Sequence, residues 1–270
     1  MTRSGRARAP STLAGIFAHP DDETWSLGGA FALLVPKGVR GVVWTATRGQ
    51  AGQIAEGSEA TRETLPQVRE AEERAAMAEV GVERVEFGDF VDGEVEGADL
   101  DALTTGVHRF LEREQPDVVV TMEPGGVTTH PDHMAVTAAT QAAFGAYAAA
   151  AGERAPRFYY WGVPVSGMAG WRQLGRASGY ELPGEDDPYG GLGTPDDQFS
   201  CTVDTSTAAE QAWRALCRHR TQAEDPWYRL LGHQDNWRAV FARSQFIRVH
   251  PAPRPGDPPE PSLVEAFTNG

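Results

Sequence analysis

Two short polar segments, each placed after an apolar run, carry side chains that can bind a metal ion or move a proton. Residues 18–23 read AHPDDE, and residues 128–133 read TTHPDH. Imidazole nitrogens and carboxylate oxygens are ligands that zinc and similar divalent ions accept. The three consecutive acids of the first segment are equally typical of the start of a helix, whose dipole favours negative charge. Taken alone, this segment leaves both a metal site and a helix cap open.

The second segment favours the metal site. It repeats the His-Pro-Asp order of the first and follows the apolar run DVVVTM through a glycine-rich turn. Pro131 suits the first position of a helix, which places His130 at the cap and His133 in the first turn. Because both segments follow strands expected in one parallel sheet, we predict that they meet at the same end of the sheet and share a metal ion.

The predicted metal ligands are His19, Asp22 and His133. Two nitrogens and one carboxylate form the protein ligand set of a catalytic zinc, which keeps one position open for water. Two side chains then remain for proton transfer. Asp21 is expected to act as the base that activates the water, and His130 to stabilise the oxyanion or protonate the leaving amine.

Two further acids lie next to these residues. Asp132 is expected to take part in catalysis by orienting His130 and keeping it cationic, although an acid at a helix start explains Asp132 equally well. Glu23 either supports the ligands from behind or is an acid at the start of the helix.

Apolar periodicity predicts the elements that position these segments. Strands are expected over 12–18, 40–47, 83–88, 116–122, 157–165 and 199–204, and helices over 26–35, 65–82, 99–114, 131–151 and 207–220. This alternation predicts an α/β fold, a Rossmann-like, mostly parallel sheet with helices on both faces. In such sheets, functional sites lie beyond the carboxyl ends of the strands.

Composition is that of a globular protein and narrows the classes of partner. The chain has 270 residues, of which 40% are hydrophobic, and a formal net charge of −14. This charge argues against a protein that grips nucleic acid or an anionic membrane. Cys201 and Cys217 are too few for a disulfide framework, and Cys217 is expected in the core. No stretch has the pattern of a signal peptide or a membrane span, so a cytoplasmic location is predicted, with a homo-oligomer left open.

The ordered pair AHPDDE and HPDH resembles the signatures of the LmbE-like, or PIG-L, deacetylases. The resemblance extends over residues 12–250 and is weaker after residue 150. It implies a Rossmann-like fold and a metal-dependent hydrolase that removes the acetyl group from an N-acetylglucosamine-type sugar, releasing acetate and a free amine. It implies zinc, or another divalent ion such as Fe²⁺, on His19, Asp22 and His133, with Asp21 as base and His130 as electrophile.

The resemblance also implies contacts with the substrate. Gln50, in TRGQAG, stands where the family has glutamate, so an amide replaces a charge. Arg69 matches an arginine that holds substrate, with a solvated helix arginine as the alternative. Asp92 matches a contact with a sugar hydroxyl, with a plain Asp-Gly turn as the alternative. His219 and Gln222, in HRTQ, match a late element near the site.

The domain prediction is a single domain over residues 1–270, with a flexible N-terminus at 1–11 and a proline-rich tail at 250–270. Residues 179–198 are rich in Gly, Pro and Asp and are expected to form a long surface loop or a lid. Some sugar deacetylases carry a tyrosine where this chain has Thr128, and Tyr189 in the long loop is the candidate to replace it.

Three alternative functions follow from the same residues. An amidase could act on another amide, such as a thiol-sugar conjugate or an N-acyl glycopeptide. A relative that binds metal or sugar without catalysis ranks lower, because both Asp21 and His130 are present. A dinucleotide-binding oxidoreductase is rejected, since it needs a glycine-rich turn directly after the first strand, where this chain has His-Pro-Asp-Asp.

Overall fold

A seven-stranded sheet forms the centre of the protein. The computed structural model describes residues 11–184, 186–187 and 190–263. Within them the strand order is β3-β2-β1-β4-β5-β7-β6, and β7 alone runs against the others. The strands are β1 (Thr12–Phe17), β2 (Arg40–Thr47), β3 (Arg84–Phe90), β4 (Val118–Met122), β5 (Arg157–Trp161), β6 (Cys201–Asp204) and β7 (Arg243–His250). The predicted mostly parallel sheet is therefore confirmed.

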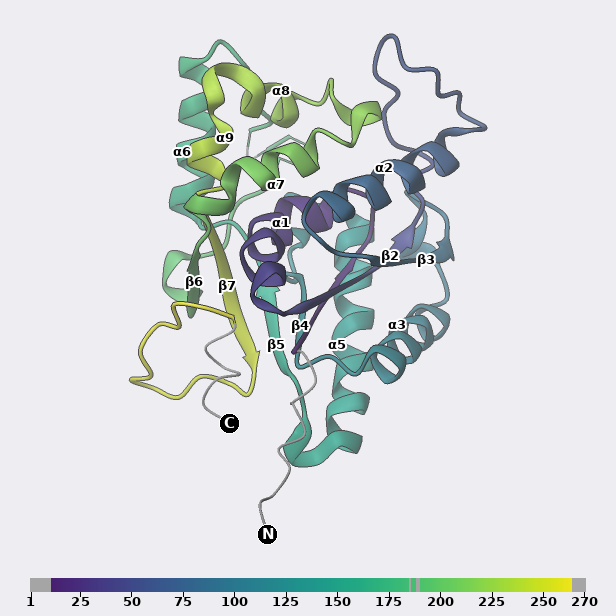
Figure 1. Cartoon of the computed structure of the whole chain (residues 1–270), viewed down its shortest axis with the longest axis vertical. Coiled ribbons are helices and arrows are strands. Elements are labelled where there is room, and N and C mark those ends of the chain that lie inside the picture. The colour runs from purple at the N-terminus through teal and green to yellow at the C-terminus, as the bar shows by residue number, and fades with distance from the viewer. Residues whose placement is uncertain (1–10, 185, 188–189, 264–270) are drawn as a thin grey trace.

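Helices cover both faces of this sheet, as predicted (Figure 1). One face packs against α1 (Asp22–Leu34), α2 (Leu65–Glu79) and α7 (Ala209–Leu216), and the other against α3 (Leu100–Glu114) and α5 (Pro131–Ala151). The remaining helices are α4 (Gly126–Thr129), α6 (Val165–Ala177), α8 (Pro226–Gly232) and α9 (Trp237–Val240). Because helices shield both faces, the central strands β1 and β4 are buried along their whole length.

Local sequence explains where the helices of the second face begin. The side chain of Asp99 accepts hydrogen bonds from the backbone N–H groups of Asp101 and Ala102, so it caps α3. Pro131 occupies the first position of α5, where its missing N–H costs nothing, and the ring of His130 accepts from the N–H of Asp132. The chain that leaves β4 therefore delivers two histidines to the start of α5.

The sequence prediction missed helices α4, α6, α8 and α9, and it differs from the structure at three further places. Helix α1 begins at Asp22 rather than at residue 26, so the acidic segment forms its first turn. Strand β7 was not predicted; it lies between β5 and β6. Helix α7 ends at Leu216, and the prediction that Cys217 lies in the core is wrong, because its side chain is exposed at the first position beyond the helix.

The segment after β7 packs against the sheet. Glu260 accepts a hydrogen bond from the phenol of Tyr159 at 2.6 Å and pairs with Arg157 and Arg248, while Leu263 is fully buried. The end of this segment, at Glu260 and Leu263, is therefore docked on the sheet, whereas residues 251–259 are exposed. Residues 1–10 and 264–270, which include most of the predicted flexible N-terminus and the end of the predicted tail, lie outside the described residues.

The long loop over 179–198 is tied to its neighbours at several points. The guanidinium of Arg172, on α6, donates to the carbonyl oxygens of Pro183 at 3.0 Å and Gly190 at 2.7 Å. Thr194 exchanges backbone hydrogen bonds with Val163 and Val165 beyond β5. Residues 185, 188 and 189 of this loop, Tyr189 among them, lie outside the described residues. No helix in the described part of the chain combines the length and the apolar character needed to span a membrane.

Candidate metal centre and active site

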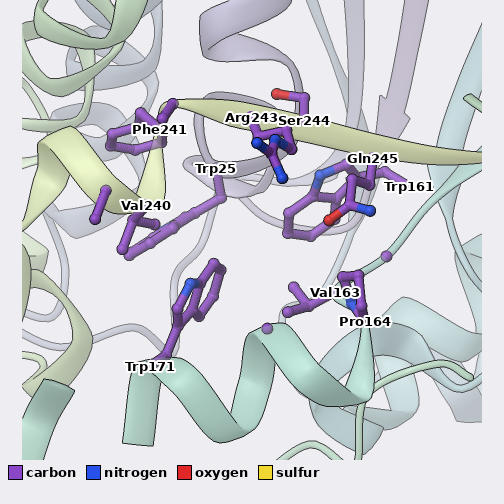
Figure 2. Close-up of a pocket in the computed structure, with 14 residues that line it drawn as sticks. Trp25, Trp161, Val163, Pro164, Trp171, Val240, Phe241, Arg243, Ser244 and Gln245 are labelled. Atoms are coloured by element: carbon purple, nitrogen blue, oxygen red, sulfur yellow. The ribbon is translucent and has the colours of Figure 1, made fainter. Parts of the chain in front are cut away.

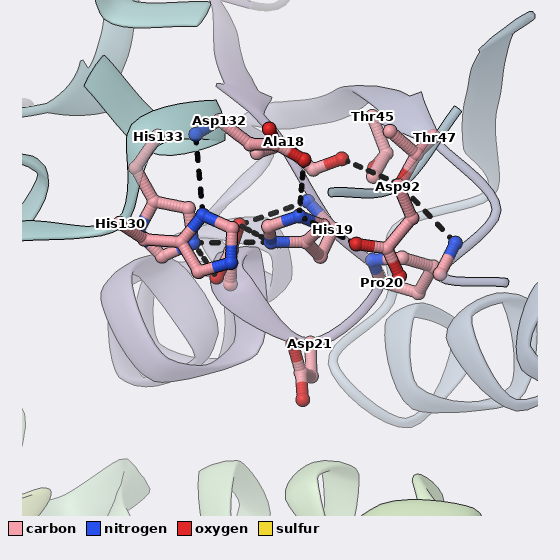
Figure 3. A network of polar contacts seen from close by, with 12 residues as sticks. Ala18, His19, Pro20, Asp21, Thr45, Thr47, Asp92, His130, Asp132 and His133 are labelled. Carbon is pink, nitrogen blue, oxygen red and sulfur yellow. Dashed lines mark hydrogen bonds and ion pairs between the residues drawn. The ribbon is translucent and has the colours of Figure 1, made fainter. Parts of the chain in front are cut away.

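The two polar segments meet where the neighbouring strands β1 and β4 end. His19 follows β1, whereas His130 and His133 come from the turn after β4 and the start of α5. Figure 3 shows these three imidazoles gathered in one cluster. The ring centroids of His19 and His130 lie 4.8 Å apart, and those of His130 and His133 lie 4.9 Å apart in a stacked arrangement. The two segments thus come together as predicted.

The predicted ligand set has the spacing of a metal site. Nδ1 of His19 lies 3.1 Å from Nε2 of His133. The Asp22 carboxylate lies 3.7 Å from Nδ1 of His19 and 3.4 Å from Nε2 of His133. Two nitrogens bound to one tetrahedral zinc, each at about 2.0–2.1 Å, lie roughly 3.3 Å apart. His19, Asp22 and His133 therefore fit a divalent ion without rearrangement of the backbone.

The opposite edge of the His19 ring faces two more acids. Nε2 lies 3.1 Å from the Asp92 carboxylate and 3.2 Å from that of Asp132. Burial lowers the pKa of His19, but its hydrogen bonds with Asp132 and Asp92 and the charge of Asp22 outweigh burial and raise this pKa to about 10. The surrounding carboxylates thus favour positive charge at this position, which suits a metal ion as well as a protonated imidazole.

A second grouping of ligand atoms shares His19. The three imidazoles of His19, His130 and His133 each offer a nitrogen within 4.8 Å of the others, and His19 forms a similar group with Asp92 and Asp132. Nδ1 of His133 lies 2.9 Å from the Gly126 carbonyl oxygen, a contact that orients the ring so that Nε2 faces Asp22. This orientation favours His133 over His130 as the metal ligand.

The carboxylate of Asp132 contacts groups beyond the expected His130. Its carboxylate accepts hydrogen bonds from the backbone N–H groups of Gly93 at 2.7 Å and Val95 at 3.0 Å, besides contacting His19. Burial and the neighbouring His19 and His133 lower the pKa of His130 to about 4, which favours a neutral ring, although the charge of Asp132 acts toward the cationic form. Asp132 also fastens the loop after β3 to the start of α5 and contacts His19.

Asp21 occupies a strained turn between β1 and α1. Its backbone φ of 121° is one that residues other than glycine rarely adopt. The turn is held because the Asp21 N–H donates to the Glu23 carboxylate at 3.1 Å and the Asp21 carbonyl accepts from Thr24 and Trp25. In Figure 3 the Asp21 side chain points away from the imidazole cluster. The strained turn thus points the Asp21 carboxylate away from the cluster, while the adjacent Asp22 carboxylate lies beside His19 and His133.

The Asp21 carboxylate is bound by two residues from distant parts of the chain. The Tyr228 phenol, on α8, donates a hydrogen bond to it at 2.8 Å, and the buried Arg69 guanidinium lies 3.6 Å away. Burial raises the pKa of Asp21 to about 7, although Arg69 and Tyr228 act in the opposite direction. A carboxylate with such a pKa is matched to accepting a proton near neutral pH.

Glu23 lies behind Asp21 in a fully buried polar cluster. Its carboxylate accepts from the Thr24 hydroxyl at 2.5 Å and lies 3.7 Å from Nε2 of His219. Burial raises the pKa of Glu23, and the same cause, together with the charge of Glu23, raises that of Glu73 beside it. Glu23 is therefore the support of the strained turn, and His219 reaches this cluster rather than the open site.

A cavity of about 520 Å³ is lined by His19, Asp22 and His133 together with Asp21 and His130; we call it the first cavity. Among the residues predicted to bind substrate, Arg69, Asp92 and Gln222 line it. Arg69 is 3% exposed, so the alternative of a solvated helix arginine is wrong. Gln50 does not line the first cavity. Its side chain instead joins two loops by accepting from the Arg48 N–H at 3.2 Å and donating to the Phe90 carbonyl at 3.1 Å.

Sequence reasoning missed Tyr228 and four tryptophans of the first cavity: Trp25, Trp161, Trp171 and Trp227. Trp25 lies one turn after Asp21 on α1, which is a signal that periodicity could have used. Tyr228 has no such signal, because it reaches Asp21 from more than 200 residues away.

Tyr228→Phe should lower kcat about tenfold, the effect of losing one hydrogen bond to a charged group. Phenylalanine keeps the ring contact with Trp25, at 5.5 Å between centroids, and removes the donor to Asp21. Steady-state kinetics with a parallel measurement of bound metal tests this expectation. An unchanged kcat, or loss of metal, would show that Tyr228 does not act through Asp21.

Comparisons with known proteins find similarity over the part of the chain that carries both motifs. A family model described as "PIG-L: GlcNAc-PI de-N-acetylase" matches residues 15–144. A curated relative from Mycolicibacterium smegmatis, named 1D-myo-inositol 2-acetamido-2-deoxy-alpha-D-glucopyranoside deacetylase, is 30% identical over 233 residues, which cover 78% of this chain and 79% of the relative.

Solved structures share the fold at lower identity. N,N′-diacetylchitobiose deacetylase from Pyrococcus horikoshii has a TM-score of 0.61 and 19% identity, covering 90% of this chain and 87% of its own. GalB, a 4-carboxy-2-hydroxymuconate hydratase from Pseudomonas putida KT2440, has a TM-score of 0.60 and 20% identity, covering 92% of this chain and 99% of its own. Proteins named for different reactions thus share this fold, and the side chains of the site must decide the chemistry.

Proposed function

Because the chain belongs to the PIG-L family, as its match to the family model and its relative of 30% identity show, we propose that it is a zinc-dependent deacetylase. The proposed reaction hydrolyses the N-acetyl group of an N-acetylglucosamine-type sugar or its conjugate and releases acetate and a free amine. One observation carries the proposal. The side chains of His19, Asp22 and His133 have the spacing of metal ligands, and they line the same cavity as Asp21 and His130.

His19, Asp22 and His133 would hold the metal ion. When bound, zinc would act as a Lewis acid that polarises the acyl carbonyl and lowers the pKa of a water molecule to about 7. The protein contributes the orientation of its ligands: Asp132 and Asp92 contact Nε2 of His19, and the Gly126 carbonyl contacts Nδ1 of His133.

Asp21 would take the proton from the attacking water. Its pKa of about 7 matches this task, and Tyr228 and Arg69 fix the direction of its carboxylate. The same carboxyl group can then return the proton to the leaving amine.

His130 would face the oxygen of the reacting carbonyl. Its Nδ1 accepts a hydrogen bond from the Asp132 backbone N–H at 3.2 Å, which places the proton of a neutral imidazole on Nε2. A neutral donor at this position stabilises negative charge on the oxygen as it develops. Arg69, Asp92 and Gln222 line the same cavity and would bind the polar groups of the sugar.

Acetate release and amine formation over a panel of substrates test the proposal. The panel contains N-acetylglucosamine, an N-acetylglucosamine–inositol conjugate, an N-acyl glycopeptide and a simple acetamide, each with and without a chelator. We expect equal amounts of acetate and amine from the amino sugars, loss of both with the chelator, and recovery on adding zinc. Cleavage of the simple acetamide alone, or turnover that persists without metal, would contradict the proposal.

A further inference from the structure

A second cavity of about 340 Å³ lies beside the first and has no role in the proposed reaction. Figure 2 shows its walls, which come from α1, the end of β5, α6, α9 and the start of β7. Val240 and Phe241 lie on one side of it, and Arg243, Ser244 and Gln245 lie on the other with Trp161 and Val163. We call it the second cavity.

The two cavities share a wall of three tryptophans. Trp25, Trp161 and Trp171 line both of them. The ring of Trp25 lies 5.5 Å from Tyr228, the residue that contacts Asp21, and 6.0 Å from Phe241 in the second cavity. Asp21, the proposed base, is therefore connected to the second cavity through Tyr228 and the ring of Trp25. A molecule whose sugar occupies the first cavity can place an attached group against the same tryptophans.

We propose that the second cavity binds a flat apolar group carried by the amino-sugar substrate. The proposal rests on the proposed function, because it assumes that the sugar and its acyl group occupy the first cavity. Tryptophan rings offer large apolar surfaces, and flat rings prefer to contact them edge-on or in offset stacks. A cavity of about 150 Å³ accepts benzene, so the second cavity accepts a fused pair of rings.

The flat group has two chemical sources. It is either an aryl aglycone on the anomeric carbon of the sugar or an aromatic acyl group on its nitrogen. Both present the same apolar surface to Trp25 and Trp171, and the substrates used in the test distinguish them.

Glycines of α6 allow a variant that fills the second cavity alone. Gly167 lines the second cavity and not the first. A Cβ atom there would meet Val163 at 3.4 Å and Pro164 at 3.5 Å, which are ordinary contacts. Gly167→Leu therefore adds a side chain to the second cavity at a helical position that favours leucine over glycine. Gly170→Leu is the matched control, because Gly170 lies on the same helix, lines neither cavity and has nothing within 4 Å of an added Cβ.

The test compares kcat/KM for three substrates: the methyl glycoside of N-acetylglucosamine, its naphthyl glycoside, and the methyl glycoside of N-naphthoylglucosamine. We expect one naphthyl substrate to exceed the methyl glycoside of N-acetylglucosamine about tenfold, the size expected from burying and stacking aromatic rings. The substrate that gains identifies the source of the flat group. Gly167→Leu should remove this gain and leave the small substrate unaffected, whereas Gly170→Leu should preserve it.

Two results would overturn the proposal: no gain with either naphthyl substrate, or an equal loss on all three substrates in Gly167→Leu. Calorimetric titration with the naphthyl and methyl glycosides of glucosamine, and with N-naphthoylglucosamine, separates this proposal from the proposed function. Suppose that a naphthyl compound binds more tightly than its methyl counterpart, that Gly167→Leu abolishes this difference, and that none of the three kinetic substrates releases an amine. This result would support the second cavity and refute the deacetylase. Amine release from the kinetic substrates, with equal binding of the naphthyl and methyl compounds, would support the deacetylase and refute the second cavity.

Discussion

Asp21→Asn should reduce kcat by about 10²–10⁴-fold, the range for loss of a general base, while the protein keeps its bound metal. Asparagine has nearly the same shape as aspartate, so it can still accept the hydrogen bond from Tyr228. It cannot accept a proton from water at neutral pH. The measurements are kcat from amine formation and metal content by elemental analysis of the same preparation.

Asp89→Asn serves as the control, because the Asp89 side chain is exposed and pairs only with Arg48 among the described ion pairs. Combining Asp21→Asn with Tyr228→Phe should cost little more than Asp21→Asn alone, since Tyr228 acts through the Asp21 carboxylate. Near-normal turnover of Asp21→Asn would refute the base assignment. Loss of metal from this variant would instead place Asp21 among the ligands.

Elements with strong local signals were predictable from the sequence. Strand β2 coincides with the predicted strand over 40–47, and α5 with the predicted helix over 131–151. The first contains the apolar run GVVW, and the second has proline at its first position and alanine along its length. Strand β7 has no comparable signal, because only Phe246, Ile247 and Val249 are apolar among its eight residues and its pairing with β5 and β6 depends on residues distant in the sequence.

The start of α1 shows why the acidic segment was difficult to interpret. Three acids are typical of a helix start, and Asp22 and Glu23 do lie in the first helical turn, but both are buried. The reason lies outside the segment: α2 supplies Arg69 and Glu73, and residues beyond α7 supply His219. Burial of this kind depends on tertiary packing, so a single segment cannot reveal it.

Pairing of the two motifs was predictable because the ends of adjacent parallel strands must meet. The partners of each side chain were not. Asp132 faces His19 and two backbone N–H groups, although its position in the chain suggested His130. Tyr228 reaches Asp21 from α8, and no spacing rule relates the two residues.

His133→Ala should remove the metal ion and with it the activity. The Nε2 atom of His133 lies 3.1 Å from His19 and 3.4 Å from Asp22, so its loss leaves two protein ligands. Loss of a contact that merely orients a ligand lowers metal affinity by about 10–100-fold, and loss of the ligand itself should exceed this. Elemental analysis after dialysis against metal-free buffer measures the effect, and circular dichroism checks that the fold persists.

His130→Ala is the decisive comparison, because the imidazoles of His19, His130 and His133 also form a group with metal-ligand spacing. If His19, Asp22 and His133 hold the ion, His130→Ala keeps a full metal complement and loses kcat by about 10²–10³-fold, as for loss of a donor to the developing oxyanion. If the three imidazoles hold it, His130→Ala loses metal as readily as His133→Ala does, and Asp22→Asn retains it. Stacking of His130 on His133 does not bias the result, since removing one ring leaves the Gly126 carbonyl to orient the other. Metal content in these three variants therefore separates the ligands from the residue that acts on the substrate.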